Sequence, residues 1–584
     1  MSVRNKSIGN LVLFLTAFII LTLPGTVQAV PAAPIVHTLT QPDGSTFKAR
    51  QWGDENLHGW ETEDGYSIVF DDSLKCWTYA VHDVTGSLTS SRRIVKRDPL
   101  PDSLMKHFRP IYQALETVPK KRLSKELQAP FSGKVVSPSG TANIPVILVN
   151  FNNTTTTYLT TDFNTLLFGT GNYSIKDYYE EVSYGAFSVS AGPSGIAGWY
   201  QASNPHDYYG TDVGGEGNDQ WPGDLVYEAV QAADATFDFA PYDQDGDGYV
   251  DVVAIIHQGT GQEASGISTD IWSHRWDLNS AYLTRKSNYG PYTTNDPRTN
   301  GSPVIVNDYI IQPEVLANEI STMGVFAHEY GHSFGLPDLY DTDGSSEGIG
   351  YWSLMASGNW NSVARSGDRP AHMDAWCKYY LGWVNPTLVS GTLTNQPIKQ
   401  AETYSDVYQL LSGSPSTGTG EYFLVENRQK TGFDAGLPGA GLLIWHIDES
   451  MSSNDKEWYP GCTLLNCSPF LHYHVALEQA DNLWNLEKNN NRGDAGDSYP
   501  GSLNNTSFDG SSSPNSNLWS GSASNVSITS ISDSGATMTA TLSTGAVPFE
   551  CSSWTDVITK YNAYVGGTAT WIDVRNCYTL YATK

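Results

Sequence analysis

The alternation of apolar and polar positions divides the chain into regions with different predicted secondary structure. Between residues 136 and 385, continuous apolar runs such as Ile144–Phe151 and Val250–His257 alternate with helical patterns such as Ile175–Tyr184. Buried strands separated by amphipathic helices are typical of an α/β unit. We therefore expect an α/β domain over residues 136–385, closed by a helix over Ala371–Leu381.

From residue 386 to residue 545 the pattern changes to short alternating runs. Tyr422–Glu426, Gly441–Ile447 and Ser527–Ile531 are of this kind, and glycine, serine, asparagine and proline separate them. Short strands between turn-forming residues predict a β-rich, β-sandwich-like domain.

The chain begins with a segment that has the order of a secretory leader. Arg4 and Lys6 precede an apolar run over Leu11–Leu23, and the small-residue pattern Val27-Gln28-Ala29 follows. We expect residues 1–29 to be a signal peptide cleaved after Ala29, and hence a secreted protein. The alternative is an uncleaved membrane anchor, but the run is short of the roughly 20 residues that a bilayer span needs. We therefore expect no membrane span in the mature form.

Residues 30–135 form the next predicted unit, and its second half is basic. The turn Asp71-Asp72-Ser73 between two apolar stretches predicts a β-hairpin, and the apolar residues from Leu104 to Leu127 follow a broken helical pattern. Between Arg92 and Lys134 the sequence has eleven lysines or arginines and four aspartates or glutamates. This favours an α+β propeptide that docks by charge and inhibits the unit behind it. A solvated, helix-rich linker is the alternative.

The amino-acid composition limits the classes of partner that we expect and is compatible with a secreted protein. Of 584 residues, 33 are Lys or Arg and 62 are Asp or Glu, which gives a formal net charge of −29. Such an acidic surface repels phosphate backbones, so we expect no nucleic-acid partner. Because 39% of the residues are hydrophobic, the chain can fill several cores, which excludes a disordered protein.

Six cysteines fit an oxidising compartment. The pairs that can form disulfides are Cys462 with Cys467, and Cys551 with Cys577 in a small accessory tail over residues 546–584. Cys76 and Cys377 are left over. The thiolate of Cys76 is one possible latency ligand for a metal, but its surroundings favour a half-buried strand residue.

The most informative stretch reads AHEYGHSFGLPD. His328 and His332 are four residues apart, so on a helix both imidazoles lie on one face. Gly335 can end that helix with a positive φ and turn the chain back, which lets Asp338 supply a third zinc ligand. The fourth position is left for water, and Glu329 can take a proton from that water as general base.

Met355 follows within the sequence WSLMASG. A methionine turn below the zinc is a companion feature of metzincins. We therefore predict a metzincin-like catalytic domain that holds Zn²⁺. The alternative is a pair of histidines on an ordinary polar helix face.

Several segments resemble one known family. HEYGHSFGLPDLYD, which is His328–Asp341, is similar to the active-site segment of the immune inhibitor A family of secreted bacterial metalloproteases, the M6 peptidases. Other segments that resemble this family are Ser174–Gly185, Ile271–Trp276, Gly441–Asp448 and Gly493–Gly501. The resemblance implies a secreted zinc endopeptidase made with a propeptide. It implies His328, His332 and Asp338 as zinc ligands, Glu329 as base and Met355 as the Met-turn.

Two acidic clusters are candidate calcium sites. The first has oxygen-bearing side chains at loop positions 1, 3, 5 and 9, which are Asp243, Asp245, Asp247 and Asp251. Position 12 is Ala254 instead of glutamate, so the loop is not a complete EF-hand; calcium is favoured over a bare acidic turn. In the second cluster, Asp481, Asp494 and Asp497, a Gly/Asp turn is favoured over calcium.

The leading functional prediction is a secreted zinc endopeptidase, made as a zymogen, that hydrolyses peptide bonds of extracellular proteins. Two alternatives remain open. The motif defines the metal chemistry but not the acyl substrate, so another zinc hydrolase, an amidase or esterase, is one of them. A calcium-dependent, non-enzymatic binding protein is the other.

Overall fold

The computed structural model describes residues 27–101, 104–111, 135–213, 218–462, 470–544, 557–558 and 561. Several sequence predictions fall outside this part of the chain: most of the leader, the basic stretch 112–134, and Cys467, Cys551 and Cys577. Cys76 and Cys377 are buried free thiols. Among the described residues, no helix has the length and apolar character needed to cross a bilayer.

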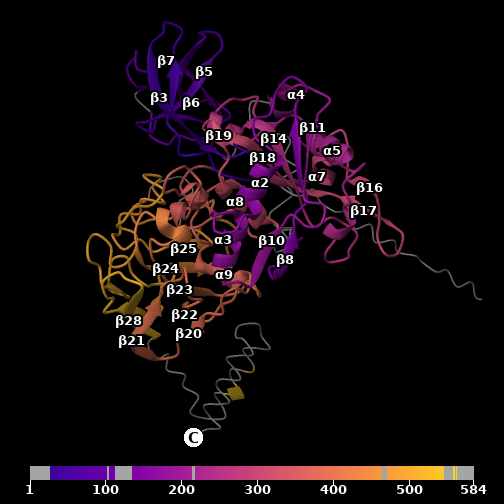
Figure 1. Ribbon diagram of the computed structural model, residues 1–584. Coiled ribbons are helices and arrows are strands. Elements are labelled where there is room, and N and C mark those ends of the chain that lie inside the picture. The colour runs from indigo at the N-terminus through magenta and orange to yellow at the C-terminus, as the bar shows by residue number, and fades with distance from the viewer. Residues whose placement is uncertain are drawn as a thin grey trace, which may run out of the picture.

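The first unit is a six-stranded antiparallel meander in the order β2-β3-β4-β5-β6-β7, indigo in Figure 1. Its strands are β2 (His37–Thr40), β3 (Thr46–Gly53), β4 (His58–Thr62), β5 (Ser67–Asp71), β6 (Cys76–His82) and β7 (Leu88–Ile94). The predicted hairpin is present, with Asp71 opposite Cys76. Residues 104–111 contain no helix, so the described part of this unit is β rather than α+β.

The central unit contains a mixed sheet in the order β1-β15-β18-β14-β9-β11, with β19 paired to β18. Its strands are β1 (Gln28–Ala29), β9 (Val146–Asn150), β11 (Ile196–Gln201), β14 (Val253–Thr260), β15 (His274–Asp277), β18 (Asp308–Leu316) and β19 (Glu319–Ile320). Strands β11, β9, β14 and β18 run parallel to one another, whereas β15 and β19 run antiparallel to β18.

Helices cover both faces of this sheet (Figure 1). The helices of the central unit are α2 (Thr160–Phe168), α3 (Ile175–Val182), α4 (His206–Gly210), α5 (Pro222–Ala233), α6 (Gln262–Ser265), α7 (Leu278–Leu283), α8 (Met323–His332) and α9 (Ala375–Tyr380). Helix α9 contacts β23 and β24 of the C-terminal unit. Val146 and Leu148 of β9 pack in one core with α3 and α8, and Ile147 and Val149 pack in another with α5. Burial on both faces explains why these strands are continuous apolar runs.

Short strand pairs flank the central sheet. They are β8 (Gly140–Asn143) with β10 (Phe187–Ser190), β12 (Asp212–Val213) with β13 (Asn218–Asp219), and β16 (Tyr292–Pro297) with β17 (Pro303–Val306).

The C-terminal unit consists of two sheets around a shared core, as the predicted β-sandwich-like domain requires. One sheet contains β20 (Thr387–Leu388), β22 (Tyr408–Leu410), β23 (Glu421–Arg428), β24 (Gly441–Asp448) and β25 (Val475–Leu477). The other contains β21 (Thr392–Lys399), β26 (Ser507–Phe508), β27 (Val526–Thr529) and β28 (Thr537–Thr544). The outer face of β23 and β24 packs on the central unit, because Tyr422 and Trp445 belong to the core that contains α8.

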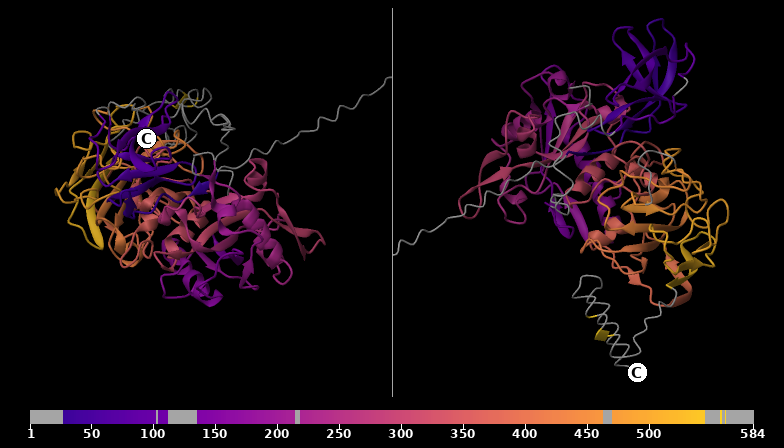
Figure 2. Two further views of the ribbon diagram at one scale, coloured as in Figure 1. Left: turned by 90° about the horizontal axis from the view of Figure 1, so that it is seen from above. Right: turned by 180° about the vertical axis from the view of Figure 1, so that it is seen from behind.

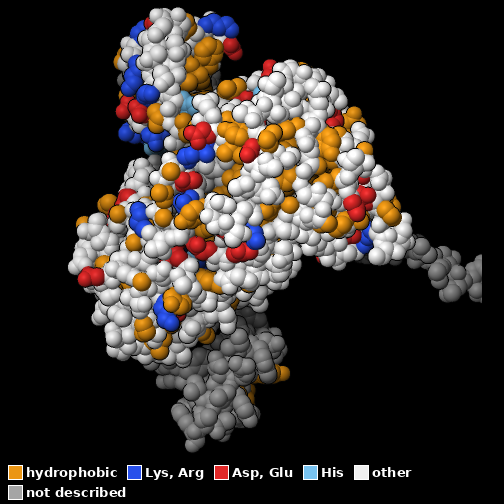
Figure 3. All heavy atoms as spheres, viewed as in Figure 1, with side chains coloured by type: hydrophobic (Ala, Val, Ile, Leu, Met, Phe, Trp, Pro, Cys, Tyr) orange, Lys and Arg blue, Asp and Glu red, His pale blue; other side chains and the backbone are white. Residues whose placement is uncertain are grey.

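The six-stranded unit projects from the molecule near the place where the other two units meet (Figure 2). On the face shown in Figure 3, basic side chains are visible on this unit beside acidic ones. Arg109 fixes the contact: its Nε donates to Gly344 O at 3.0 Å, and its guanidinium lies 4.2 Å from the Trp52 ring centroid.

Candidate metal centre and catalytic site

The two histidines of the motif lie on α8, a helix whose ten residues are all buried. Thr322 occupies the N-cap position, but its hydroxyl donates to Ser366 O at 2.7 Å instead of capping the helix. After the helix ends at His332, Gly335 has a φ of +84°. This is the positive φ that the sequence predicts, and it turns the chain so that Asp338 returns to the histidines.

Three donor atoms converge at this point. His328 Nε2 lies 3.1 Å from Asp338 Oδ1 and 3.2 Å from His332 Nε2, and His332 Nε2 lies 3.3 Å from Asp338 Oδ1. For ligands at the usual zinc distances, neighbouring corners of a tetrahedron are about 3.3 Å apart. The spacing of the three atoms therefore fits a zinc ion.

Backbone carbonyls orient both imidazole rings. His328 Nδ1 lies 2.8 Å from Leu354 O, and His332 Nδ1 lies 2.9 Å from Leu336 O. Because a carbonyl oxygen only accepts, each Nδ1 carries the proton and each Nε2 presents a lone pair to the metal. Burial lowers the pKa of His328, which favours the neutral, ligating form.

Asp338 remains a carboxylate in this setting. Burial acts to raise its pKa, but His332 and His328 outweigh that effect and lower the pKa below the ordinary value. One carboxylate oxygen and two imidazole nitrogens are ligand types that hydrolytic zinc sites use.

Glu329 lies beside these ligands without joining them. Its side chain is fully buried, and neither carboxylate oxygen has a hydrogen bond of ordinary geometry among the described residues. Burial, with the charges of Asp338 and Glu263, raises its pKa well above the usual value; the amides of Val30 and Arg275 oppose this rise. A carboxylate with a raised pKa is suited to accept a proton near neutral pH.

Met355 lies beneath the helix, where the sequence places a Met-turn. A Cβ added to Gly331 would be 2.6 Å from Met355 Sδ, so this methionine packs directly against the backbone between the two histidines. The same turn supplies Leu354 O to His328. Gly331 therefore allows close helix-to-turn packing, a reason that helix propensity alone does not reveal.

An extended segment near the start of the described chain crosses the site. Strand β1 pairs antiparallel with the edge strand β15, with Ala29 opposite His274. Tyr340 Oη lies 2.6 Å from Ala29 O and 2.8 Å from Asp54 Oδ2. Burial raises the pKa of Asp54 to about 7, and the hydrogen bond that Tyr340 donates to its carboxylate opposes this rise.

The following residues of this segment are held through their backbone carbonyls. Trp272 Nε1 donates to Val30 O at 2.9 Å, Trp360 Nε1 donates to Pro31 O at 2.9 Å, and Arg492 Nη1 donates to Ala32 O at 3.0 Å. The side chains of Val30, Ala32 and Ala33 are buried in an apolar cluster with Leu316 and Val325. The site thus holds an extended peptide by its main chain.

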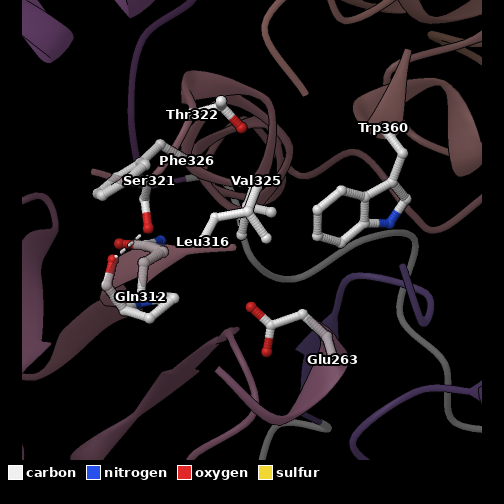
Figure 4. A pocket seen from close by; sticks show the side chains of 9 residues that line it. Glu263, Gln312, Leu316, Ser321, Thr322, Val325, Phe326 and Trp360 are labelled. Carbon is white, nitrogen blue, oxygen red and sulfur yellow. Dashed lines mark hydrogen bonds between the residues drawn. The ribbon is translucent and has the colours of Figure 1, made fainter. Parts of the chain in front are cut away.

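A small cavity of about 10 Å³ lies behind this cluster (Figure 4). Leu316, Val325 and Trp360 line it together with the buried side chains of Glu263 and Gln312. Both polar side-chain atoms of Gln312 lack a hydrogen-bond partner among the described residues. A volume of this size is about that of one water molecule, which would satisfy the Gln312 amide.

The sequence predictions missed the residues that hold the peptide. Tyr340, Trp272 and Trp360 contact a segment some 240 to 330 positions earlier in the chain, so no local pattern connects them. His274 of β15 is buried, with Nδ1 at 2.8 Å from Trp272 O and Nε2 at 3.2 Å from Tyr309 Oη. Burial lowers its pKa to about 4, as expected for a structural histidine.

The first acidic loop is only partly assembled as predicted. Asp243, Asp245 and Asp247 each place a carboxylate oxygen within 4.8 Å of the others, and Asp251 is not in this group. Asp251 instead accepts a hydrogen bond from Gln244 N at 3.1 Å. The guanidinium of Arg298 contacts Asp243 Oδ2 at 3.0 Å, so it competes with a cation for that ligand.

Three converging donors with a buried carboxylate beside them are an arrangement that metal-dependent hydrolases use. A comparison with protein families points to one kind of hydrolase. Residues 152–384 match the family described as "Immune inhibitor A peptidase M6, catalytic domain". This segment of the chain is therefore similar to the catalytic domain of the M6 peptidases.

Two similar proteins have names that agree with this family match. The "Pre-pro-metalloprotease PrtV" of Vibrio cholerae serotype O1 is 36% identical over 238 residues, which are 36% of this chain and 24% of the relative. The "Immune inhibitor A" of Bacillus thuringiensis subsp. alesti is 37% identical over 212 residues, which are 32% of this chain and 28% of the relative. The aligned regions thus span about a quarter of these relatives.

Proposed function

We propose that this protein is a secreted, zinc-dependent endopeptidase that acts on extracellular proteins and is made as a zymogen. One observation carries the proposal. Residues 28–33 of the chain itself run as an extended segment beside α8 and the edge strand β15, and are held through the carbonyls of Val30, Pro31 and Ala32. Because an edge strand binds peptides through main-chain hydrogen bonds, this geometry favours a peptide substrate over the small amides and esters of the rival hydrolase.

His328, His332 and Asp338 would hold the zinc ion. When bound, zinc supplies Lewis acidity and lowers the pKa of water. Residues of the chain carry out the proton transfer and bind the substrate carbonyl. Glu329 accepts and returns a proton, and Tyr340 donates its hydroxyl to the carbonyl oxygen of the substrate, at the place that Ala29 O occupies.

The same arrangement supports an inhibitory propeptide. Residues 30–33, which remain after cleavage at Ala29, are held beside the metal centre, and the six-stranded unit anchors them, because Ala32 N donates to Gly53 O at 2.8 Å. We infer that residues 30–135 block the site until they are removed. Residues 1–29 are then the signal peptide, 136–385 the catalytic domain, 386–545 the β-rich domain and 546–584 the accessory tail.

Calcium is the second proposed cofactor, at the loop of Asp243, Asp245, Asp247 and Asp251. Three of these carboxylates already converge. Binding requires Arg298 to leave Asp243, and Asp251 joins the loop only through a backbone contact. The non-enzymatic calcium-binding protein is disfavoured, since such a protein has no use for the buried Glu329.

The test is cleavage of casein by the processed protein and by its Glu329→Gln variant, with zinc measured in both. Glu319→Gln is the matched control, because it makes the same change at a side chain that is 65% exposed. We expect about one zinc in each protein and a loss of about 10²- to 10⁴-fold in rate for Glu329→Gln alone. Equal rates would exclude Glu329 as the base, and zinc-loaded wild type that leaves casein intact would exclude the endopeptidase.

A further inference from the structure

A second group of converging carboxylates lies in the C-terminal unit, in the loop between β25 and β26. Asp481, Asp494 and Asp497 each place one carboxylate oxygen within 4.8 Å of the others. The sequence favours a plain Gly/Asp turn here. Three observations beyond the clustering itself indicate a ligand.

The first observation is an unpartnered oxygen in the interior. The Asp497 side chain is fully buried, and its Oδ1 has no hydrogen-bond partner among the described residues. Its Oδ2 is occupied, since it accepts from Trp352 Nε1 at 3.1 Å and from Asp494 N at 2.9 Å. Oδ1 is therefore the oxygen left for a cation, and a buried carboxylate oxygen without a donor is costly.

The second observation is a space kept open by a glycine. Oδ1 of Asp494 would be 2.9 Å from a Cβ at Gly496, and the same Cβ would overlap Oδ2 of Asp481. The two oxygens therefore come together over a position where any side chain would fill the gap. Asn491 Nδ2 donates to Asp494 Oδ2 at 2.8 Å and Leu483 N donates to Asp481 Oδ1 at 2.9 Å. Of the two inward oxygens, Asp494 Oδ1 also accepts from Gly496 N at 2.7 Å.

The third observation is uncompensated negative charge. Burial, together with the charges of Asp494 and Asp481, raises the pKa of Asp497 to about 7. Burial and the charge of Asp494 also raise the pKa of Asp481. Asp494 lines a cleft of about 590 Å³ together with Tyr351 and Trp360, which gives an ion a route from solvent.

We propose that Asp481, Asp494 and Asp497 bind a divalent cation of the calcium class. Three carboxylates, completed by carbonyls and water, form an all-oxygen donor set. Such a set suits Ca²⁺ better than it suits zinc, which favours nitrogen and sulfur ligands. This site is separate from the loop of Asp243 and from the histidine site, and it does not depend on peptidase activity.

The position of the cation site gives it a structural role. Asp497 binds the indole of Trp352, and Tyr351 N donates to Arg492 O at 2.6 Å. Residues 351–355 then lead to Leu354 O, which orients His328. A cation that orders the 481–497 loop therefore stabilises the turn beneath the metal centre.

The test uses the full chain with Glu329→Gln, which prevents self-digestion, and with Asp245→Asn and Asp247→Asn, which disable the other loop at exposed positions. After dialysis against CaCl₂, bound calcium is measured by mass spectrometry and unfolding by calorimetry. We expect about one calcium per chain and a rise of about 5 °C in Tm. Adding Asp481→Asn should abolish both, whereas Asp533→Asn, at an exposed control position, should change neither.

Equal calcium content with and without Asp481→Asn would overturn the proposal, as would a Tm shift produced by MgCl₂ but not by CaCl₂. Asp497→Asn gives a second variant at the buried ligand, and it should also lose the ion. Zinc content is followed in every sample. Loss of zinc with retained calcium would concern the proposed peptidase site and not this one.

Discussion

Two main-chain oxygens determine which ring nitrogens His328 and His332 present to a metal. Leu354 O and Leu336 O each accept from Nδ1 and leave Nε2 free. The i and i+4 spacing and the glycine turn are local features, so the sequence alone predicts that these donors meet Asp338. The partners of the two Nδ1 atoms are not predictable in the same way, because they depend on how the Met355 turn folds under the helix.

Tyr340→Phe tests the hydroxyl that contacts Ala29 O. If Tyr340 stabilises the developing charge on a substrate carbonyl, the variant should lose about 10- to 10³-fold in kcat with a smaller change in KM. Steady-state kinetics of the processed enzyme measure both constants. Tyr249→Phe, at a side chain 43% exposed, serves as the control, and an unchanged kcat in Tyr340→Phe would remove the tyrosine from the reaction.

Helix α8 packs closely on the turn below it because Gly331, which faces that turn, has no side chain. Gly331 lets Met355 pack against the backbone between the histidines, which couples helix position to turn position. The sequence correctly predicts that this helix exists and ends before Gly335. It does not predict the pairing of β1 with β15, because the hydrogen-bonded residues are about 245 positions apart and β1 is only two residues long.

Gly331→Ala should therefore destabilise the central unit by about 1 to 3 kcal/mol through overpacking and weaken zinc binding. Thermal unfolding and zinc titration measure the two effects. Met355→Ala should relieve part of the penalty in the double variant, which a double-mutant cycle detects. Additive effects of the two substitutions would mean that the glycine and the methionine do not contact each other.

At the scale of the whole molecule, the six-stranded unit contacts the rest through a buried charge cluster. Arg109 Nη2 donates to Glu61 Oε2 at 3.1 Å, and His107 Nδ1 lies at the same distance from that oxygen. Burial acts to raise the pKa of Glu61, but the charges of Arg109 and His107 outweigh it and hold the pKa at about 2. Arg109 also reaches Gly344 of the central unit.

This cluster predicts acid-sensitive docking. Because the folded pKa of Glu61 lies below its unfolded value, its stabilisation is present above about pH 4.5 and is lost as the pH falls toward 2; it amounts to about 3 kcal/mol at most. Calorimetry of the full chain from pH 7 to pH 2 should show a steeper fall in Tm for wild type than for Glu61→Gln. Parallel curves would mean that Glu61 does not govern the acid response.

Latency gives a second prediction at this scale. Ala33→Asp places a charge in the apolar cluster that holds residues 30–33, and should release the segment and raise proteolysis by the uncleaved chain. Val36→Asp adds the same charge at a position that is 44% exposed and should have no effect. The measurement is the rate of peptide cleavage by each of the two unprocessed variants. If neither variant cleaves the peptide, another part of the propeptide blocks the site.

If residues 30–33 block the site as proposed, their covalent connection to it has a consequence for inhibitor discovery. A tethered occupant acts at an effective concentration of about millimolar, however dilute the protein is. If the untethered segment binds with a dissociation constant near micromolar, any competitive compound would bind the uncleaved chain roughly a thousandfold more weakly than the processed one. Screens for such compounds will find them only with the processed form.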